Sequence, residues 1–127
     1  MNEKLLNLDE MGGKMRIVQE LVPGRQITLA HIIANPGEIL YRKLGLDPAV
    51  EYSKSAIGVL TISPHETAII AADIAIKASS ADLGFVDRFS GTLILTGTVS
   101  AVEASFEAIA TYVRDKLGFT VCNVTRT

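Results

Sequence analysis

The densest cluster of apolar residues lies between positions 55 and 79 of the chain. Residues 56–62 form a short apolar run rich in β-forming side chains, and the sequence then changes to helix-forming residues. At this junction Ser63 is a favourable N-cap, Pro64 suits the first helical position, and Glu66 lies where a capping-box carboxylate reaches back. The pattern predicts a strand that leads directly into a helix.

This helix is apolar on nearly every side. Its polar positions form a thin stripe of Glu66, Asp73 and Lys77, and small or branched apolar residues fill the rest: Ala68, Ile69, Ile70, Ala71, Ala72, Ile74, Ala75, Ile76 and Ala78. Such a helix has to be buried on more than one side, and a chain of 127 residues has few ways to do that alone. We therefore expect a subunit interface as its second cover.

Two β-prone segments precede this unit. Residues 16–22 end at the turn signal Pro23-Gly24, and residues 26–34 form a second run. They predict two strands joined by a tight connection. Residues 1–15 are polar apart from Leu5, Leu6, Leu8 and Met11, and predict a flexible leader. The leader is either a disordered tail or a short amphipathic helix that docks a partner.

A second helix start follows the second of these strands. Asn35 suits the cap, Pro36 the first position and Glu38 the third, as in the helix after Ser63. Gly45 predicts the end of a short helix, and residues 46–54 predict a polar connection.

The C-terminal part contains a hairpin and a third helix. Residues 82–89 and 92–99 are β-prone and are separated by Ser90-Gly91, which is typical of a two-residue hairpin loop. Ser100 and Glu103 form a capping box for a helix that runs to about Leu117, with Gly118 just past its end. Its apolar stripe is one-sided and consists of Val102, Phe106, Ile109, Ala110, Val113 and Leu117. Residues 119–125 predict a closing strand.

Residues 55–127 therefore follow the order β-α-β-β-α-β. This is the split βαβ (ferredoxin-like) pattern of an α+β fold, in which two helices pack on one face of an antiparallel sheet. We expect one domain over residues 16–127, with the N-terminal strands and short helix added to this unit.

Composition narrows the function classes. A hydrophobic content of 48%, the lack of Trp and a net charge of −2 are typical of a globular protein and give no electrostatic reason for nucleic-acid binding. No apolar run reaches the roughly 20 residues that span a bilayer, so we expect no membrane insertion and a cytoplasmic protein. The single Cys122 has no partner for an intramolecular disulfide, which fits a reducing compartment, and we expect it to be a buried, inert thiol.

No catalytic pattern is visible in the sequence. His31 and His65, the only histidines, lie near no nucleophile or acid in a known arrangement, and we expect ordinary core or surface positions for both. Asp87 and Arg88 are adjacent in a predicted strand, so their side chains point to opposite faces. We expect no catalytic residue, no metal site and no cofactor.

Several motifs together resemble one known family. They are A-I-G-V-L-T-I-S-P-H-E-T-A-I-I-A-A-D-I-A-I-K-A at 56–78, G-F-V-D-R-F-S-G at 84–91 and G-T-V-S-A-V-E-A at 97–104. They resemble the shell domain (BMC domain) of bacterial microcompartments. The segment V-P-G-R-Q-I-T-L-A-H-I-I-A-N-P-G at 22–37 is similar to circularly permuted members of the family from propanediol and ethanolamine compartments. The resemblance implies a permuted BMC domain, with its usual last strand and short helix moved in front of the core.

The resemblance also implies functions. A shell subunit would form homo-hexamers that tile the microcompartment shell together with other shell proteins. Such hexamers would limit or gate metabolite passage and contact encapsulated enzymes. Lys77 and the segment Asn35-Pro36-Gly37 would lie at the edge between hexamers. The simpler interpretations are a solvated ion pair of Lys77 with Asp73, and an ordinary helix start at Asn35.

The same resemblance places two segments near the ring axis. Phe89, Ser90 and Gly91 would approach the pore, which is compatible with an ordinary tight turn. Residues 16–22 would form one strand of a small parallel barrel around the sixfold axis, with the set Ile17, Gln19 and Leu21 facing its lumen. Alternatively, this segment adds to the sheet of its own subunit.

Two rival functions remain at this stage. The split βαβ fold hosts many activities, so a small-molecule sensor or an enzyme is one alternative. A module that tethers cargo through its leader is the other.

Overall fold

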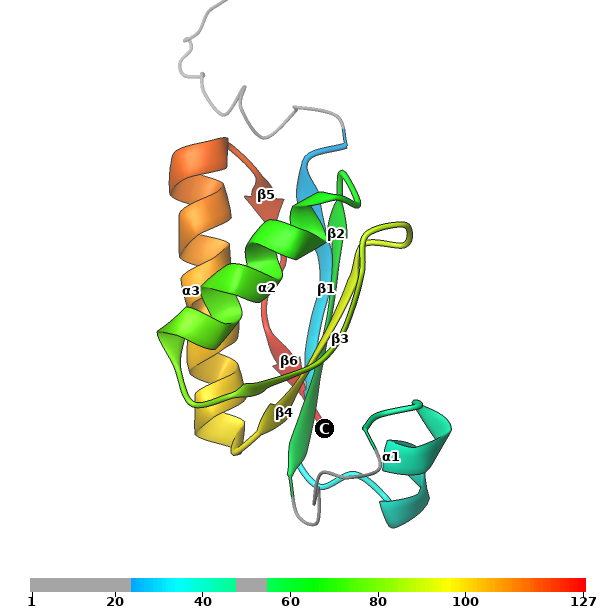
Figure 1. Cartoon of the computed structure of the whole chain (residues 1–127). Coiled ribbons are helices and arrows are strands. Elements are labelled where there is room, and N and C mark those ends of the chain that lie inside the picture. The colour runs from blue at the N-terminus through cyan, green and yellow to red at the C-terminus, as the bar shows by residue number, and fades with distance from the viewer. Residues whose placement is uncertain (1–23, 48–54) are drawn as a thin grey trace, which may run out of the picture.

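The computed structural model describes residues 24–47 and 55–127 (Figure 1). The described elements are, in chain order, β1 (Gln26–Ile33), α1 (Glu38–Lys43), β2 (Ala56–Ser63), α2 (Thr67–Ala78), β3 (Asp82–Asp87), β4 (Thr92–Gly97), α3 (Val99–Leu117), β5 (Thr120–Val121) and β6 (Thr125–Arg126). This arrangement confirms the predicted α+β class.

The strands form one sheet in the order β3-β4-β2-β1-β5, and β6 also pairs with β1. The pairs β3/β4, β4/β2 and β2/β1 are antiparallel, whereas β5 and β6 run parallel to β1. In the register of the two central strands, Ala30 lies opposite Leu60 and Ile33 opposite Ile57. The first described strand thus lies inside the sheet, although it comes from the N-terminal half of the chain.

The two long helices, α2 and α3, cover one face of this sheet, as predicted (Figure 1). The main core lies between them and the sheet, and its fully buried side chains include Leu60, Leu93, Leu95, Val102, Phe106 and Ile109. Gly58 lies directly beneath α3, and a Cβ atom at this position would collide with Val102 and Phe106. Only glycine therefore lets α3 pack this closely on β2.

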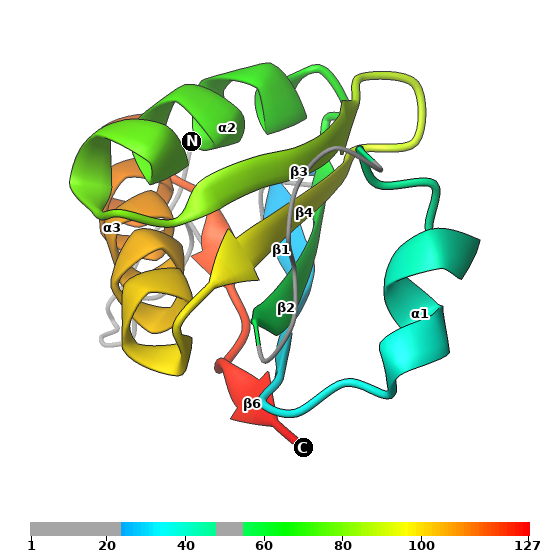
Figure 2. The same ribbon diagram turned by 60° about the horizontal axis from the view of Figure 1, so that its bottom comes forward.

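The short helix α1 lies on the opposite face of the sheet (Figure 2). Tyr41 and Leu46 pack there against Ile57 and Ile94 in a second, smaller cluster. The Tyr41 hydroxyl donates a hydrogen bond to the Ser55 carbonyl. Strand β2 supplies both cores because successive side chains point to opposite faces. The predicted packing of two helices on one face is confirmed for α2 and α3, and the added short helix α1 covers part of the other face.

The closing strand differs from the prediction. Instead of one strand over residues 119–125, the structure has the short strands β5 and β6, and both lie outside β1. In a split βαβ unit, the last strand would lie beside the first strand, β2. Here β1 occupies that position and leaves the C-terminal segment at the sheet edge.

The predicted helix caps also need correction. Ser63 is the last residue of β2, opposite Gln26 of β1, so its backbone belongs to the sheet and it does not cap a helix. The N-cap of α2 is Glu66, whose side chain makes no capping bond. In α3 the cap is Thr98 rather than Ser100, and the Thr98 hydroxyl accepts a hydrogen bond from the Ala101 N–H at 3.1 Å.

The other predicted helix ends give a mixed result. Helix α1 begins after Gly37, not after Asn35. Its predicted end is confirmed, since Gly45 has φ of 73° and donates its N–H to the Arg42 carbonyl at 3.1 Å. Gly118 ends α3 as predicted, with a left-handed conformation at φ of 73°.

Candidate functional site

The outward side of α2 is only partly covered by the residues that the structure describes. Its inward residues Ala68, Ala71 and Ala75 are fully buried. Its outward isoleucines are not: Ile69 is 51%, Ile70 45% and Ile76 48% exposed. Branched apolar residues that remain half exposed along one helix face mark a surface for another protein. The predicted second cover of α2 would lie here.

Lys77 lies in the last turn of this helix. Its ammonium group is 2.8 Å from the Asp73 carboxylate, and both side chains are more than half exposed. This is the ion pair of the simpler interpretation, and an exposed pair at this spacing contributes only a few tenths of a kcal/mol. Lys77 is therefore available to other contacts, and its role at a hexamer edge stays a prediction.

The second predicted edge segment comes from the other side of the molecule. Asn35, Pro36 and Gly37 link the end of β1 to α1, whereas Lys77 belongs to the helix layer on the opposite face. The C-terminal residue Thr127 lies beside this link, because its carbonyl accepts the Ala34 N–H at 2.8 Å. The two parts of the predicted edge come from different elements, and their common role between hexamers stays a prediction.

The β3–β4 hairpin ends in a four-residue loop, residues 88–91, rather than the predicted two-residue loop. Asp87 explains the difference. Its carboxylate accepts hydrogen bonds from the Phe89 N–H at 2.9 Å and from the Ser90 hydroxyl at 2.8 Å. The Phe89 N–H, followed by the Ser90 hydroxyl, lowers the pKa of Asp87 below its ordinary value. Asp often accepts a hydrogen bond from the backbone N–H two residues further on in turns, so Asp87 was the sequence signal for this longer loop.

Gly91 fixes the loop on the body of the subunit. It has φ of 73°, its N–H donates to the Asp87 carbonyl and its carbonyl accepts the Ile62 N–H, both at 2.9 Å. A side chain at this position would collide with the Ile62 carbonyl oxygen and crowd His65. The hairpin tip is thus held tightly against the turn between β2 and α2.

This rigid tip carries an aromatic ring and a cation. Phe89 is 77% exposed, and the Arg88 guanidinium lies 4.9 Å from the centre of its ring. Neither group is needed for the core. The contact between Arg88 and Phe89 was not predicted, because it depends on the four-residue loop.

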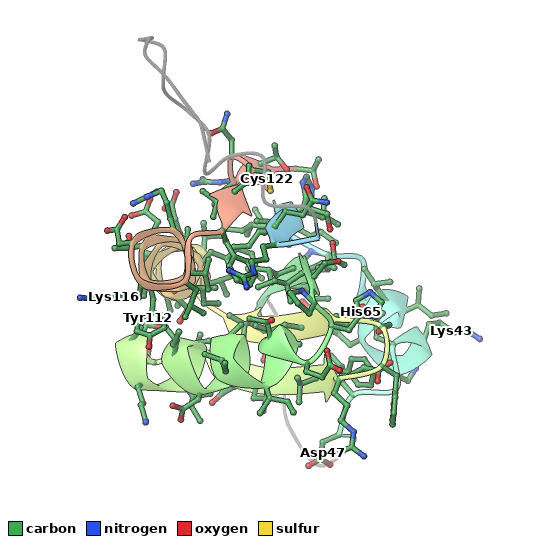
Figure 3. The ribbon with its side chains drawn as sticks, turned by 90° about the horizontal axis from the view of Figure 1, so that it is seen from above. Lys43, Asp47, His65, Tyr112, Lys116 and Cys122 are labelled. Atoms are coloured by element: carbon green, nitrogen blue, oxygen red, sulfur yellow. The ribbon has the colours of Figure 1, made fainter. Side chains whose placement is uncertain are left out.

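The remaining candidate residues show no catalytic arrangement. His31 is half-buried, with Nδ1 2.6 Å from Thr125 Oγ1 and Nε2 2.9 Å from Thr127 Oγ1. Cys122 is half-buried rather than fully buried, and Figure 3 shows it well separated from His65. Within residues 24–47 and 55–127, no group of three or more His, Cys, Asp or Glu could hold a metal ion.

Two further expectations concern the N-terminal residues and membrane insertion. The predicted lumen residues Ile17, Gln19 and Leu21 and the leader lie outside the described residues. Of the helices that the structure describes, none combines the length and the hydropathy needed to cross a membrane.

Comparison with known proteins shows which class of protein this is: the matches are to shell proteins of bacterial microcompartments. The family model described as "BMC domain" matches residues 56–125. The shell protein PduU of Salmonella typhimurium is 53% identical over 112 residues, which are 88% of this chain and 93% of PduU. A solved structure titled "CutR flat hexamer, form 1" is 49% identical with a TM-score of 0.75, and the match covers 89% of this chain and all of that chain.

The chain therefore belongs to the BMC-domain family of microcompartment shell proteins. The family match begins at β2, yet β1 lies in the middle of the same sheet. That is the arrangement expected for a circularly permuted domain. A fused permuted hexameric shell protein, 21% identical with a TM-score of 0.58 over 67% of this chain and 44% of that chain, shares the fold.

Proposed function

We propose that this protein is a non-catalytic subunit of a homo-hexameric ring that tiles a microcompartment shell and limits the passage of metabolites. The outward face of α2, with Ile69, Ile70 and Ile76 half exposed, is the observation that carries the proposal. A neighbouring subunit in a closed ring would supply the missing cover. The 49% identical CutR forms a flat hexamer, which supports the same assembly here.

Native mass spectrometry tests the ring directly. We expect a hexamer of the 13.6 kDa chain at micromolar concentration. A stable monomer or dimer under these conditions would contradict the proposal.

The hairpin loop would line the axial passage. Its backbone is fixed by Asp87 and Gly91, so Phe89 and Arg88 would meet the passing molecules at defined positions. We expect Phe89→Ala to speed the leakage of a small aldehyde from assembled shells. Leu83→Ala, on the exposed edge strand of the same hairpin, is the control and should leave leakage unchanged if only the loop faces the passage.

Lys77 and the segment Asn35-Pro36-Gly37 would connect neighbouring rings. Lys77→Ala removes a charge whose pair with Asp73 is exposed, so each ring should stay intact while rings tile into sheets less readily. Electron microscopy of purified rings measures the tiling. Lys116→Ala, which removes an exposed Lys from α3, is the matched control, and equal tiling of the two variants would count against the edge role.

The absence of catalysis is part of the proposal. The part of the chain that the structure describes contains no cluster of metal ligands, and the relatives carry the names of shell proteins. Tight binding of a small metabolite to the isolated ring, measured by calorimetry, would instead favour the sensor or enzyme alternative.

A further inference from the structure

The two faces of the sheet are covered to different extents. Helices α2 and α3 pack on one face, and the short helix α1 lies on the other (Figure 2). On that other face, Tyr41 and Leu46 of α1 pack around Ile57. Farther from α1, Leu29 is 41% and Phe85 43% exposed. We call this less covered part the open sheet face, and its residues are Thr28, Leu29, Val59, Thr61, Phe85 and Thr92.

Strand pairing places these residues side by side. Leu29 of β1 lies opposite Thr61 of β2, and Val59 of β2 and Phe85 of β3 both lie opposite Ile94 of β4. Val59 and Thr61 are two residues apart, so they point to the same face of the sheet. The open sheet face therefore extends across four strands, from β1 to β3.

The hydroxyl groups on the open sheet face have partners within the subunit. Thr28 Oγ1 lies 2.6 Å from Thr61 Oγ1, and the Thr28 hydroxyl also donates to the Thr61 carbonyl at 3.3 Å. Thr92 Oγ1 is 3.0 Å from Ser90 Oγ. Apolar side chains can therefore cover these hydroxyls without leaving an unpaired polar group.

The outward side of α2 has the matching character and size. The buried positions of this helix are mostly alanines, whereas its half-exposed positions are the larger Ile69, Ile70 and Ile76. A helix of 12 residues is about 18 Å long. Four strands at a spacing of about 4.8 Å span about 14 Å. One α2 helix is thus long enough to cross the open sheet face.

Ring symmetry links the two surfaces. A contact of α2 with another α2 across a two-fold axis ends at a dimer, whereas a closed ring needs two different surfaces on each subunit. Those two surfaces have to face away from one another, because they meet different neighbours. The outward side of α2 and the open sheet face satisfy this condition, since they lie on opposite sides of the sheet (Figure 2).

We propose that the outward side of α2 packs on the open sheet face of the next subunit in the ring. Helix α2 then lies between two sheets, with its alanines on its own sheet and its isoleucines on that of the neighbour. The inference rests on the proposed ring and adds to it the surface that receives α2.

A charge on the open sheet face tests the proposal. We expect Leu29→Asp to convert hexamers to monomers in native mass spectrometry, with an unchanged far-ultraviolet circular dichroism spectrum. Ile39→Asp is the matched control, because Ile39 is 56% exposed and lies on the outer side of α1, two residues from the buried Tyr41. This control should keep the hexamer, and intact hexamers of Leu29→Asp would overturn the proposal.

Cysteine pairs test the contact directly. In a Cys122→Ser background, we combine Leu29→Cys with Ile70→Cys in one variant and with Ile76→Cys in another. A short bis-maleimide should link different chains of at least one variant and give a ladder up to the hexamer on a denaturing gel. Leu29→Cys with Ala104→Cys, on the exposed side of α3, is the control and should give no ladder.

The outcomes separate this contact from the ring itself. Intact rings without a ladder from either pair would overturn the contact and leave the proposed ring standing. Linked dimers from Ile70→Cys alone would overturn the contact as well, because they would show that α2 meets a second α2. A Cys122→Ser parent that forms no ring in native mass spectrometry would overturn the proposed ring and the contact with it.

Discussion

The two long helices lie in one layer but differ in how they are capped and in how much of their apolar surface is buried. Helix α3 has a side-chain cap at Thr98, a glycine end at Gly118 and an apolar stripe whose central residues Val102, Phe106, Ile109 and Val113 are fully buried. Helix α2 has no side-chain cap, and its outward isoleucines remain half exposed. Within residues 24–47 and 55–127, the apolar stripe of α3 is mostly covered, whereas the outward isoleucines of α2 remain half exposed. The difference separates residues that specify the fold from residues that specify the assembly.

Removing a core residue of α3 should have the largest effect on folding. Phe106 is 1% exposed and packs over Gly58, so Phe106→Ala leaves a cavity that should cost about 3–5 kcal/mol of unfolding free energy. Urea denaturation at a fixed protein concentration measures this. Ala104→Ser on the exposed side of α3 should stay within about 0.5 kcal/mol of the parent. A small effect of Phe106→Ala would mean that α3, too, depends on the assembly.

The outward side of α2 should respond in the opposite way. The double variant Ile69→Asp, Ile70→Asp should leave the subunit folded, with an unchanged far-ultraviolet circular dichroism spectrum, and abolish the ring. Burying the exposed halves of these two side chains is worth about 2 kcal/mol per interface, and two buried carboxylates would add a desolvation cost.

Native mass spectrometry distinguishes the outcomes for this double variant. Ala104→Asp adds a charge to the exposed side of α3 and should keep the hexamer. Intact hexamers of the double variant would show that another surface holds the ring together.

The helix caps give a smaller contrast. Thr98→Ala removes the hydroxyl that accepts the Ala101 N–H and should cost about 1 kcal/mol. Ser100→Ala, inside the first turn, should change the unfolding free energy by less than about 0.5 kcal/mol. Thermal unfolding of the two variants ranks them, and the reverse order would restore Ser100 as the cap.

The smallest effect concerns the hairpin loop at low pH. The folded state lowers the pKa of Asp87 through the Phe89 N–H and the Ser90 hydroxyl. Its stabilising contribution is therefore complete above the unfolded pKa of about 3.9 and is lost as the pH falls through the lower folded pKa. We expect the Phe89 amide resonance to shift only in this acidic range. Asp87→Asn should abolish that titration, whereas Asp82→Asn at the start of the same strand should preserve it.

Local pattern was sufficient for most elements of the fold. The periodicity of α3 and the β-prone runs of β1, β2 and β4 are properties of neighbouring residues, and the predicted ranges match the structure within a few positions. Ser63 was assigned wrongly because its backbone pairs with Gln26, a contact 37 positions away that no local cap pattern contains. The closing strand failed for the same reason, since its position depends on where β1 inserts.

The site was less predictable than the fold. The outward face of α2 could be anticipated from composition alone, because isoleucines surround the helix. The open sheet face and the stack of Arg88 on Phe89 could not, since each needs two segments at a defined distance. Whether Lys77 contacts another ring depends on surfaces that lie outside a single chain.

The central position of β1 also governs when the protein can fold. Gln26 pairs with Thr120 and His31 with Thr125, so the strand that is made early needs partners 94 residues further along the chain. Contacts of such high sequence separation slow folding, because a long loop has to close before they form. During synthesis on the ribosome, β1 can pair with β2 early, but its other edge stays open until the last residues of the chain have emerged.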